Sequence, residues 1–150
     1  MTCVLSCKLL KAEEKIIKVA IIGCGSVSNR YIVHLQSSPL VKIVSLCDIK
    51  QDRAEAQNKK YNIGASTYNH IDALLNGNAF DLMLTLTDMQ MHGALNKIAL
   101  QAGKHVWSEK PLANTYAEGK ALEIEKLTEA NASLRENVSL LQVMNDDLQQ

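Results

Sequence analysis

The sequence has few aromatic residues, only two prolines and no excess of either charge. Aromatic side chains make up 4% of the 150 residues, and 16 basic side chains balance 16 acidic ones. Nucleic acid is therefore not an expected partner, because neither a basic surface nor a set of stacking rings is available to bind it. No apolar run is long enough to cross a bilayer, so we expect no membrane partner. The hydrophobic content of 47% instead indicates a globular domain with a core.

Cysteine is sparse, and its spacing excludes the common metal sites. The four cysteines are Cys3, Cys7, Cys24 and Cys47. None stands in a Cys-x-x-Cys pair, and no histidine–cysteine spacing is typical of zinc, so we expect no metal. Reduced thiols indicate a cytoplasmic protein. Residues 1–15 have neither a basic start nor a small-residue cleavage site, so we expect an N-terminal extension and not a signal peptide.

A glycine turn follows the β-branched run of residues 16–22 and leads into a helical sequence. This layout predicts a dinucleotide-binding loop. Gly23 allows the tight turn, Gly25 lets the backbone approach a pyrophosphate, and the helix points its free N–H groups at that anion. Ser28 stands at the third glycine position, so a plain strand–helix connection remains the alternative. The candidate phosphate-binding residues are Gly23, Cys24, Gly25, Ser26 and Val27.

An acidic residue ends the next predicted strand, which covers residues 41–47. Asp48 lies near the expected spacing of about 20 residues beyond the glycines. A carboxylate there accepts hydrogen bonds from ribose hydroxyls and repels a 2′-phosphate, which favours NAD over NADP. Lys50 and Arg53 follow closely and keep NADP allowed. The alternative is that Asp48 caps a helix over residues 51–61.

Strand and helix patterns alternate along the chain, which predicts an α/β fold with a Rossmann-type, doubly wound parallel sheet. The predicted strands cover residues 16–22, 41–47, 65–68, 80–86 and 104–107. The predicted helices cover residues 26–37, 51–61, 70–75 and 91–102, with Asn69 as the cap of the third. Ligands of such folds bind at the carboxyl ends of the strands. We therefore expect Gly23, Asp48, Thr87 and residues 109–111 to lie along one edge of the sheet.

A further motif follows the last predicted strand. Residues 102–113, AGKHVWSEKPLA, closely resemble the AGKHV-x-x-EKPLA segment of the glucose–fructose oxidoreductase/inositol dehydrogenase (Gfo/Idh/MocA) family. Residues 19–26, the pair Cys47-Asp48, and Thr87 with His92 are similar to other elements of that family, so the resemblance covers residues 16–127. It implies an NAD(P)-dependent oxidoreductase that transfers hydride with a sugar, a cyclitol or a related hydroxy compound.

The resemblance also implies roles for single residues. Lys110 would be the catalytic residue, lying near nicotinamide and substrate and stabilising the negative charge that develops on the reacting hydroxyl. Glu109 would shape the turn beside the cofactor, and Thr87 and His92 would also belong to the cofactor site. The alternatives are a solvated loop lysine and a packing or capping histidine. Asp88 departs from the family pattern, which usually has proline there, and it adds a negative charge near the expected nicotinamide.

Leucines recur every seven residues near the C-terminus, at Leu127, Leu134, Leu141 and Leu148. Three positions ahead of them, Ile124, Asn131, Val138 and Asn145 alternate apolar side chains with asparagine. This heptad predicts a long C-terminal helix over residues 121–150 that pairs as a two-stranded coiled coil in a homodimer. The alternatives are a helix that folds back on its own sheet and a helix that frays.

These patterns predict three regions: an N-terminal extension over residues 1–15, an NAD(P)-binding Rossmann domain over residues 16–120, and an amphipathic heptad helix over residues 121–150. We expect the family's second, substrate-binding domain to be absent, and with it the usual acid–base histidine. A non-catalytic nucleotide-binding or assembly module, dimerising through the heptad helix, is therefore the alternative function. The expected small-molecule partners are a nicotinamide dinucleotide and a polyol or sugar.

Overall fold

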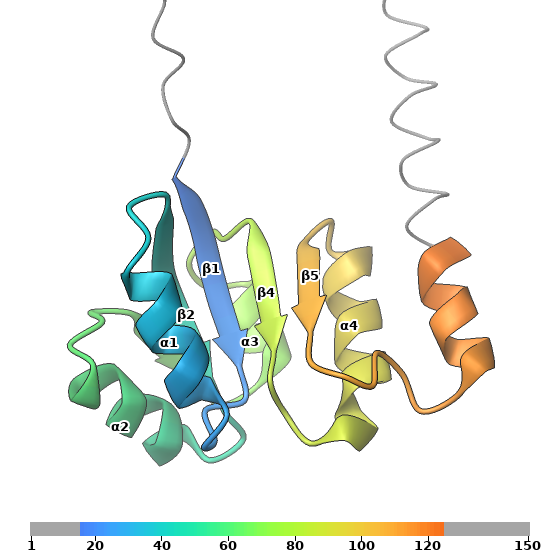
Figure 1. The fold of residues 1–150 in the computed structure, drawn as a ribbon, viewed down its shortest axis with the longest axis horizontal. Coiled ribbons are helices and arrows are strands. Elements are labelled where there is room, and N and C mark those ends of the chain that lie inside the picture. Colours follow the sequence, from blue (N-terminus) through green and yellow to red (C-terminus); the bar gives the residue numbers. More distant parts are fainter. Residues whose placement is uncertain (1–15, 125–150) are drawn as a thin grey trace, which may run out of the picture.

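The computed structural model describes residues 16–124, which form one parallel sheet covered by helices on both faces (Figure 1). The strand order is β3-β2-β1-β4-β5, and each neighbouring pair is parallel. The strands are β1 (Ile17–Ile22), β2 (Val41–Cys47), β3 (Ser66–Tyr68), β4 (Leu82–Thr85) and β5 (His105–Ser108). This order is that of a doubly wound nucleotide-binding sheet, so the predicted fold class is confirmed.

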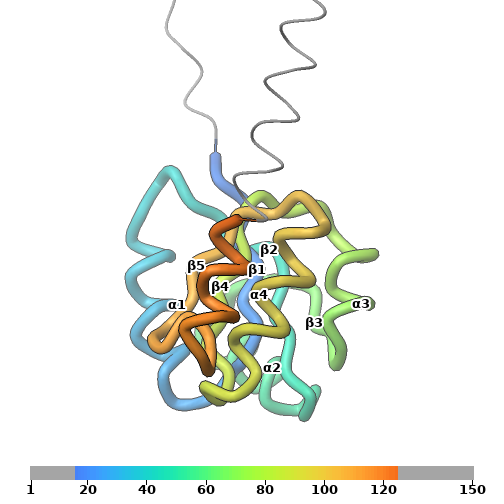
Figure 2. Tube along the Cα trace, turned by 90° about the vertical axis from the view of Figure 1, so that its right-hand side faces the viewer, coloured from blue at the N-terminus to red at the C-terminus, as the bar shows by residue number. Residues whose placement is uncertain are grey.

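Helices cover both faces of the sheet. They are α1 (Ser28–Gln36), α2 (Gln51–Lys60), α3 (Ile71–Leu75) and α4 (His92–Gln101), with the 3₁₀ turn η1 (Met89–Met91) ahead of α4. Figure 2 shows α1 on one side of the strands and α3 on the other. Residues 116–124 are also helical and lie beside α4. Because parallel strands need long crossover connections, each helix returns the chain to the amino end of the sheet.

Two cores result from the alternation of side chains along the central strand β1. Val19 and Ile21 pack with side chains of α1 and α2, whereas Ala20 and Ile22 pack with side chains of α3 and α4. Since both faces of β1 are covered, its sequence is apolar throughout its buried part rather than alternating.

Several predicted boundaries shift by one or two residues. The first helix begins at Ser28 and not at residue 26, because residues 26 and 27 belong to the turn. The third helix is capped by His70, whose ring nitrogen accepts the Asp72 N–H at 3.4 Å. The prediction of Asn69 as that cap was therefore wrong.

The predicted extension over residues 1–15 and most of the heptad region lie outside the described residues. Of the long C-terminal helix predicted over residues 121–150, only residues 121–124 are described, and these are helical. Between residues 16 and 124, the structure has no helix with the length and apolar character needed to span a membrane.

Candidate functional site

The carboxyl ends of four strands meet along one edge of the sheet, as the sequence predicts. Backbone hydrogen bonds tie these ends together: the Gly23 N–H donates to the Cys47 oxygen at 2.8 Å, and the Glu109 N–H donates to the Thr85 oxygen at 3.1 Å. Thr87 follows β4 by two residues and lies beside Gly23. The residues singled out from the sequence are thus neighbours in space.

The two glycines of the first turn meet different requirements. Gly23 has a φ of +97°, and a Cβ built there would lie 2.5 Å from the carbonyl carbon of Leu86. Both the backbone conformation and the space therefore require glycine. Among the described residues, no atom lies within 4 Å of the position that a Cβ of Gly25 would take. The backbone of Gly25 thus faces open space, from which a ligand can approach it closely.

Three backbone amides line this open space. Within residues 16–124, the N–H groups of Gly25, Ser26 and Val27 have no hydrogen-bond acceptor. The next amide, that of Ser28, donates to the Gly25 oxygen at 3.2 Å, and its hydroxyl donates to the same oxygen at 2.7 Å. We call the three free N–H groups, together with the start of α1, the amide cradle. Free amides at a helix N-terminus are suited to bind a phosphate group.

Asp48 fastens the cradle to the end of β2. Its carboxylate accepts the Cys24 N–H at 2.9 Å through one oxygen and the Lys50 N–H at 2.9 Å through the other. Lys50, not Asp48, is the residue that precedes α2, and no side chain caps that helix. The capping alternative was therefore wrong, and the carboxylate instead sets the geometry of the glycine turn.

The two cysteines near this turn are buried and carry free thiols. Burial, with the charge of Asp48 adding to it, raises the pKa of Cys24 to about 12 and that of Cys47 to about 12. The Cys24 thiol lies 3.5 Å from the Cys47 oxygen, to which it donates. Because a thiolate is the reactive form, both cysteines have a packing role here and not a chemical one.

A second turn, residues 109–112, follows β5 at the same edge. Glu109 accepts a hydrogen bond from the Tyr31 hydroxyl through one oxygen and the Lys110 N–H at 3.2 Å through the other. The Tyr31 bond lowers the pKa of Glu109 and, in return, raises the pKa of Tyr31. The Lys110 side chain is exposed, and its ammonium has no partner among the described residues. That ammonium is a charged donor that is free to bind a ligand at this edge.

His92 and Asn96 hold this second turn from the other face of the sheet. The His92 ring nitrogens lie 2.7 Å from the Pro111 oxygen and 3.0 Å from the Thr87 oxygen. Asn96 donates to the Leu112 oxygen at 3.1 Å and accepts the Thr85 hydroxyl at 2.8 Å. His92 is only 2% exposed, so this arrangement favours the packing alternative for its role.

Sequence reasoning missed Tyr31 and Asn96. Asn96 follows His92 by four residues in an otherwise largely apolar helix, and a polar pair on one face is a signal that could have found it. Tyr31 is bonded to a residue 78 positions away, and nothing in its local sequence indicates that contact.

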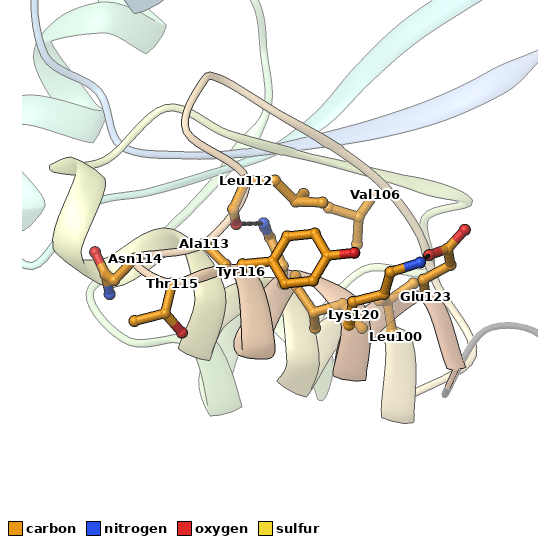
Figure 3. A pocket seen from close by; sticks show the side chains of 12 residues that line it. Leu100, Val106, Leu112, Ala113, Asn114, Thr115, Tyr116, Lys120 and Glu123 are labelled. Carbon is orange, nitrogen blue, oxygen red and sulfur yellow. Dashed lines mark hydrogen bonds and ion pairs between the residues drawn. The ribbon is translucent and has the colours of Figure 1, made fainter.

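Two hollows lie near these turns. One of 560 Å³ runs along α1 and is lined by Ser26, Val27, Arg30, Tyr31, His34 and Glu109. The other, of 810 Å³, lies between α4, β5 and the helix of residues 116–124, where Figure 3 shows Tyr116 and Lys120 between Val106 on one side and Leu100 on the other. In the part of the chain that is described, no cluster of His, Cys, Asp or Glu is placed to hold a metal ion.

The strand order, the glycine turn and the carboxylate that fastens it define a Rossmann-type domain with free backbone N–H groups at one edge. Residues 17–136 match the family model of oxidoreductases with an NAD-binding Rossmann fold, the Gfo/Idh/MocA family. The chain belongs to that family, as the resemblance of its motifs implied.

Individual relatives support the same assignment. An inositol 2-dehydrogenase from Salmonella typhimurium is 33% identical over 103 residues, which are 68% of this chain and 31% of the relative. A myo-inositol dehydrogenase from Lactobacillus casei, solved with NAD(H) and myo-inositol, gives a TM-score of 0.71 at 28% identity over 75% of this chain and 34% of that one. A 3-ketoreductase from Actinomadura kijaniata, solved with NADP and TDP-benzene, gives a TM-score of 0.71 at 26% identity. The match covers 76% of this chain and 35% of that one. The chain spans about a third of the length of the relatives it matches.

Proposed function

We propose that this chain is the cofactor-binding domain of an NAD(P)-dependent oxidoreductase that transfers hydride with a sugar, a cyclitol or a related hydroxy compound. The amide cradle carries the proposal, because it combines a glycine facing open space with N–H groups that have no acceptor among the described residues. We assign residues 16–120 to this domain. The relatives solved with NAD(H) or NADP at the same fold support the choice of cofactor.

The described residues fit a nicotinamide dinucleotide in two places. The N–H groups of Gly25, Ser26 and Val27 would bind the pyrophosphate, since they combine free donors with the positive end of α1. Asp48 would accept hydrogen bonds from ribose hydroxyls with the lone pairs that Cys24 and Lys50 leave free. Its negative charge would repel a 2′-phosphate, which supports NAD as the preferred cofactor.

Lys110 is the proposed catalytic residue at the other end of the edge. When bound, the nicotinamide ring supplies the hydride acceptor or donor. The Lys110 ammonium would donate a hydrogen bond to the reacting oxygen of the substrate and stabilise negative charge there. Its exposure, and the rigid turn on either side of it, support this role. His92 helps to hold the turn in place and contacts the Thr87 oxygen. Thr87 lies beside Gly23, where the cofactor would cross the edge of the sheet.

Titration with NADH and NADPH tests the proposal directly. Trp107, the single tryptophan, is 59% exposed on β5, so its emission should be quenched by energy transfer to bound NADH. We expect Gly25→Ala to weaken NADH binding about tenfold or more, because the new methyl group would occupy the cradle. Gly119→Ala is the matched control, since its Cβ also meets open space but lies far along the chain in another helix. No saturable binding of either nucleotide below millimolar concentration would overturn the proposal.

The substrate class is proposed from the relatives. Inositol 2-dehydrogenases and a D-apiose dehydrogenase from Paraburkholderia graminis are among them, and these are named for polyol or sugar substrates. We accordingly expect a small polyhydroxy compound to occupy the space beside Lys110. A compound that binds beside Lys110 should slow the acetylation of this lysine by a chemical reagent. The degree of slowing, measured in the presence of NADH, would rank the candidate compounds.

We also propose that residues 121–150 form a heptad helix through which the chain dimerises. The repeat of Leu127, Leu134, Leu141 and Leu148 supports pairing. Sedimentation of the full chain and of a chain ending at Lys126 tests it, and a monomer in both cases would contradict it. We place the protein in the cytoplasm, a proposal supported by the free thiols of Cys24 and Cys47.

A further inference from the structure

Among the described residues, two side chains hold the turn that carries Lys110 on one face of the sheet, and one side chain holds it on the other. On the α4 face, His92 and Asn96 bind the oxygens of Pro111 and Leu112. On the α1 face, the hydroxyl of Tyr31 reaches the turn through the carboxylate of Glu109. Tyr31 lies one helical turn beyond Val27, so this contact joins the start of α1, where the cradle lies, to the turn of the lysine.

The Glu109 carboxylate is the only acidic group next to Lys110 in sequence, and both of its oxygens are already engaged. Oε1 accepts the Tyr31 hydroxyl, and Oε2 accepts the backbone N–H of Lys110. The charge of Lys110 contributes to the lowered pKa of Glu109, which places the two charges within electrostatic reach. A carboxylate released from Tyr31 would therefore have a cation close by.

We propose that Tyr31 is a positioning residue: its hydroxyl holds the Glu109 carboxylate on the α1 side and so keeps the Lys110 ammonium available for a substrate oxygen. The inference rests on the proposed function of Lys110, and it adds to it a residue from a distant part of the sequence. An ammonium already paired with Glu109 would have to break that pair before it could bind a substrate oxygen. The hydrogen bond from Tyr31 therefore favours the free ammonium over the internal ion pair.

The rate at which trace acetic anhydride acetylates Lys110, read by mass spectrometry against exposed Lys97 in the same molecule, measures that availability. In Tyr31→Phe we expect Lys110 to react about two- to fivefold more slowly, the range that an exposed ion pair supplies. Tyr116→Phe is the matched control, because Tyr116 is 82% exposed and its removal should leave the rate unchanged.

A rescue variant separates positioning from a general loosening of the turn. Adding Glu109→Gln to Tyr31→Phe removes the carboxylate that would capture the ammonium, so the Lys110 rate should return to that of the unaltered chain. A loosened turn would not be restored by that second change. An unchanged rate in Tyr31→Phe, or a slow rate that persists in the double variant, would overturn the inference.

The same samples measured with NADH distinguish the inference from the proposed function. If the proposed function holds, NADH slows acetylation of Lys110 in the unaltered chain. A slower rate in Tyr31→Phe that the double variant restores, without protection by NADH, would support the role of Tyr31 and overturn the proposed function. Protection by NADH with no effect of Tyr31→Phe would support the proposed function and overturn the role of Tyr31.

Discussion

The two turns at the carboxyl edge of the sheet each leave a hydrogen-bond donor without an acceptor among the described residues, but they are held in place in different ways. The cradle turn after β1 is fixed through its backbone groups: Gly23 takes a positive φ, and the Cys24 N–H donates to the Asp48 carboxylate. It leaves backbone N–H groups free. The turn after β5 is fixed by side chains from two distant helices, those of Tyr31, His92 and Asn96, and leaves the Lys110 side chain free.

The difference follows from what each donor would bind. A pyrophosphate is large and carries charge on several oxygens, so an array of rigid amides suits it. A reacting hydroxyl presents one atom whose charge changes during the reaction, and a single charged side chain that can approach it suits that task. A backbone-fixed turn tolerates few changes to its own residues. A turn fixed by side chains instead depends on residues elsewhere, and the predictions below test this contrast.

The largest expected effect is on the cradle turn itself. Gly23→Ala should lower the free energy of unfolding by about 3 kcal/mol or more, because the new methyl group would meet Leu86 in a backbone conformation that alanine disfavours. Urea unfolding followed by Trp107 emission measures the change. Gly25→Ala, two residues away, should change stability by less than about 0.5 kcal/mol. Equal stability of the two variants would contradict a backbone-fixed turn.

The second turn should instead be sensitive at a residue outside it. Asn96→Ala leaves the buried Thr85 hydroxyl and the Leu112 oxygen without their partner, and we expect a loss of about 2 kcal/mol. The exposed Asn69→Ala serves as the control and should cost less than about 0.5 kcal/mol. Urea unfolding again provides the measurement. A cost for Asn96→Ala as small as that of the control would show that α4 does not hold the turn.

Asp48, beside the cradle turn, should determine whether the site prefers NADH or NADPH. Asp48→Ala should weaken NADH binding about tenfold or more, since hydrogen bonds to a charged acceptor are lost, and NADPH binding by a smaller factor. The smaller loss for NADPH is expected because removing the carboxylate also removes its repulsion of the 2′-phosphate. Parallel titrations with both nucleotides test this. The same loss for both would count against a ribose contact and leave Asp48 only its bond to the glycine turn.

The contrast between the turns also explains what the sequence could predict. Gly23 and Asp48 were found because their roles depend on neighbours in the sequence and on the regular spacing of strand ends. The family motif located Lys110 and Glu109, but the partners of Glu109 could not be deduced. Tyr31 and Glu109 are 78 residues apart, and only the folded sheet brings α1 to the end of β5. Boundaries were off by at most two residues, as at the start of the first helix, where residues 26 and 27 belong to a turn, and at the start of β4.

The smallest expected effect is the pH dependence that the bond between Tyr31 and Glu109 adds to stability. The fold raises the pKa of Tyr31, so the stabilisation from this bond is complete below the ordinary phenol pKa of 10.0 and is lost as pH rises through the raised value. The fold lowers the pKa of Glu109, so its part is complete above the ordinary carboxyl pKa of 4.5 and is lost as pH falls through the lowered value.

The stability difference between the unaltered chain and Tyr31→Phe should therefore be constant between about pH 5 and pH 10 and shrink on either side. Arg30 and His34 line the same hollow and are present in both chains, so the comparison isolates the contribution of the Tyr31 hydroxyl. Urea midpoints across the pH range measure it, with Tyr116→Phe as the control. A difference that does not shrink outside that window would mean that the Tyr31 hydroxyl stabilises the fold in some way other than its bond to the Glu109 carboxylate, and the second turn would then have no fastening on the α1 face.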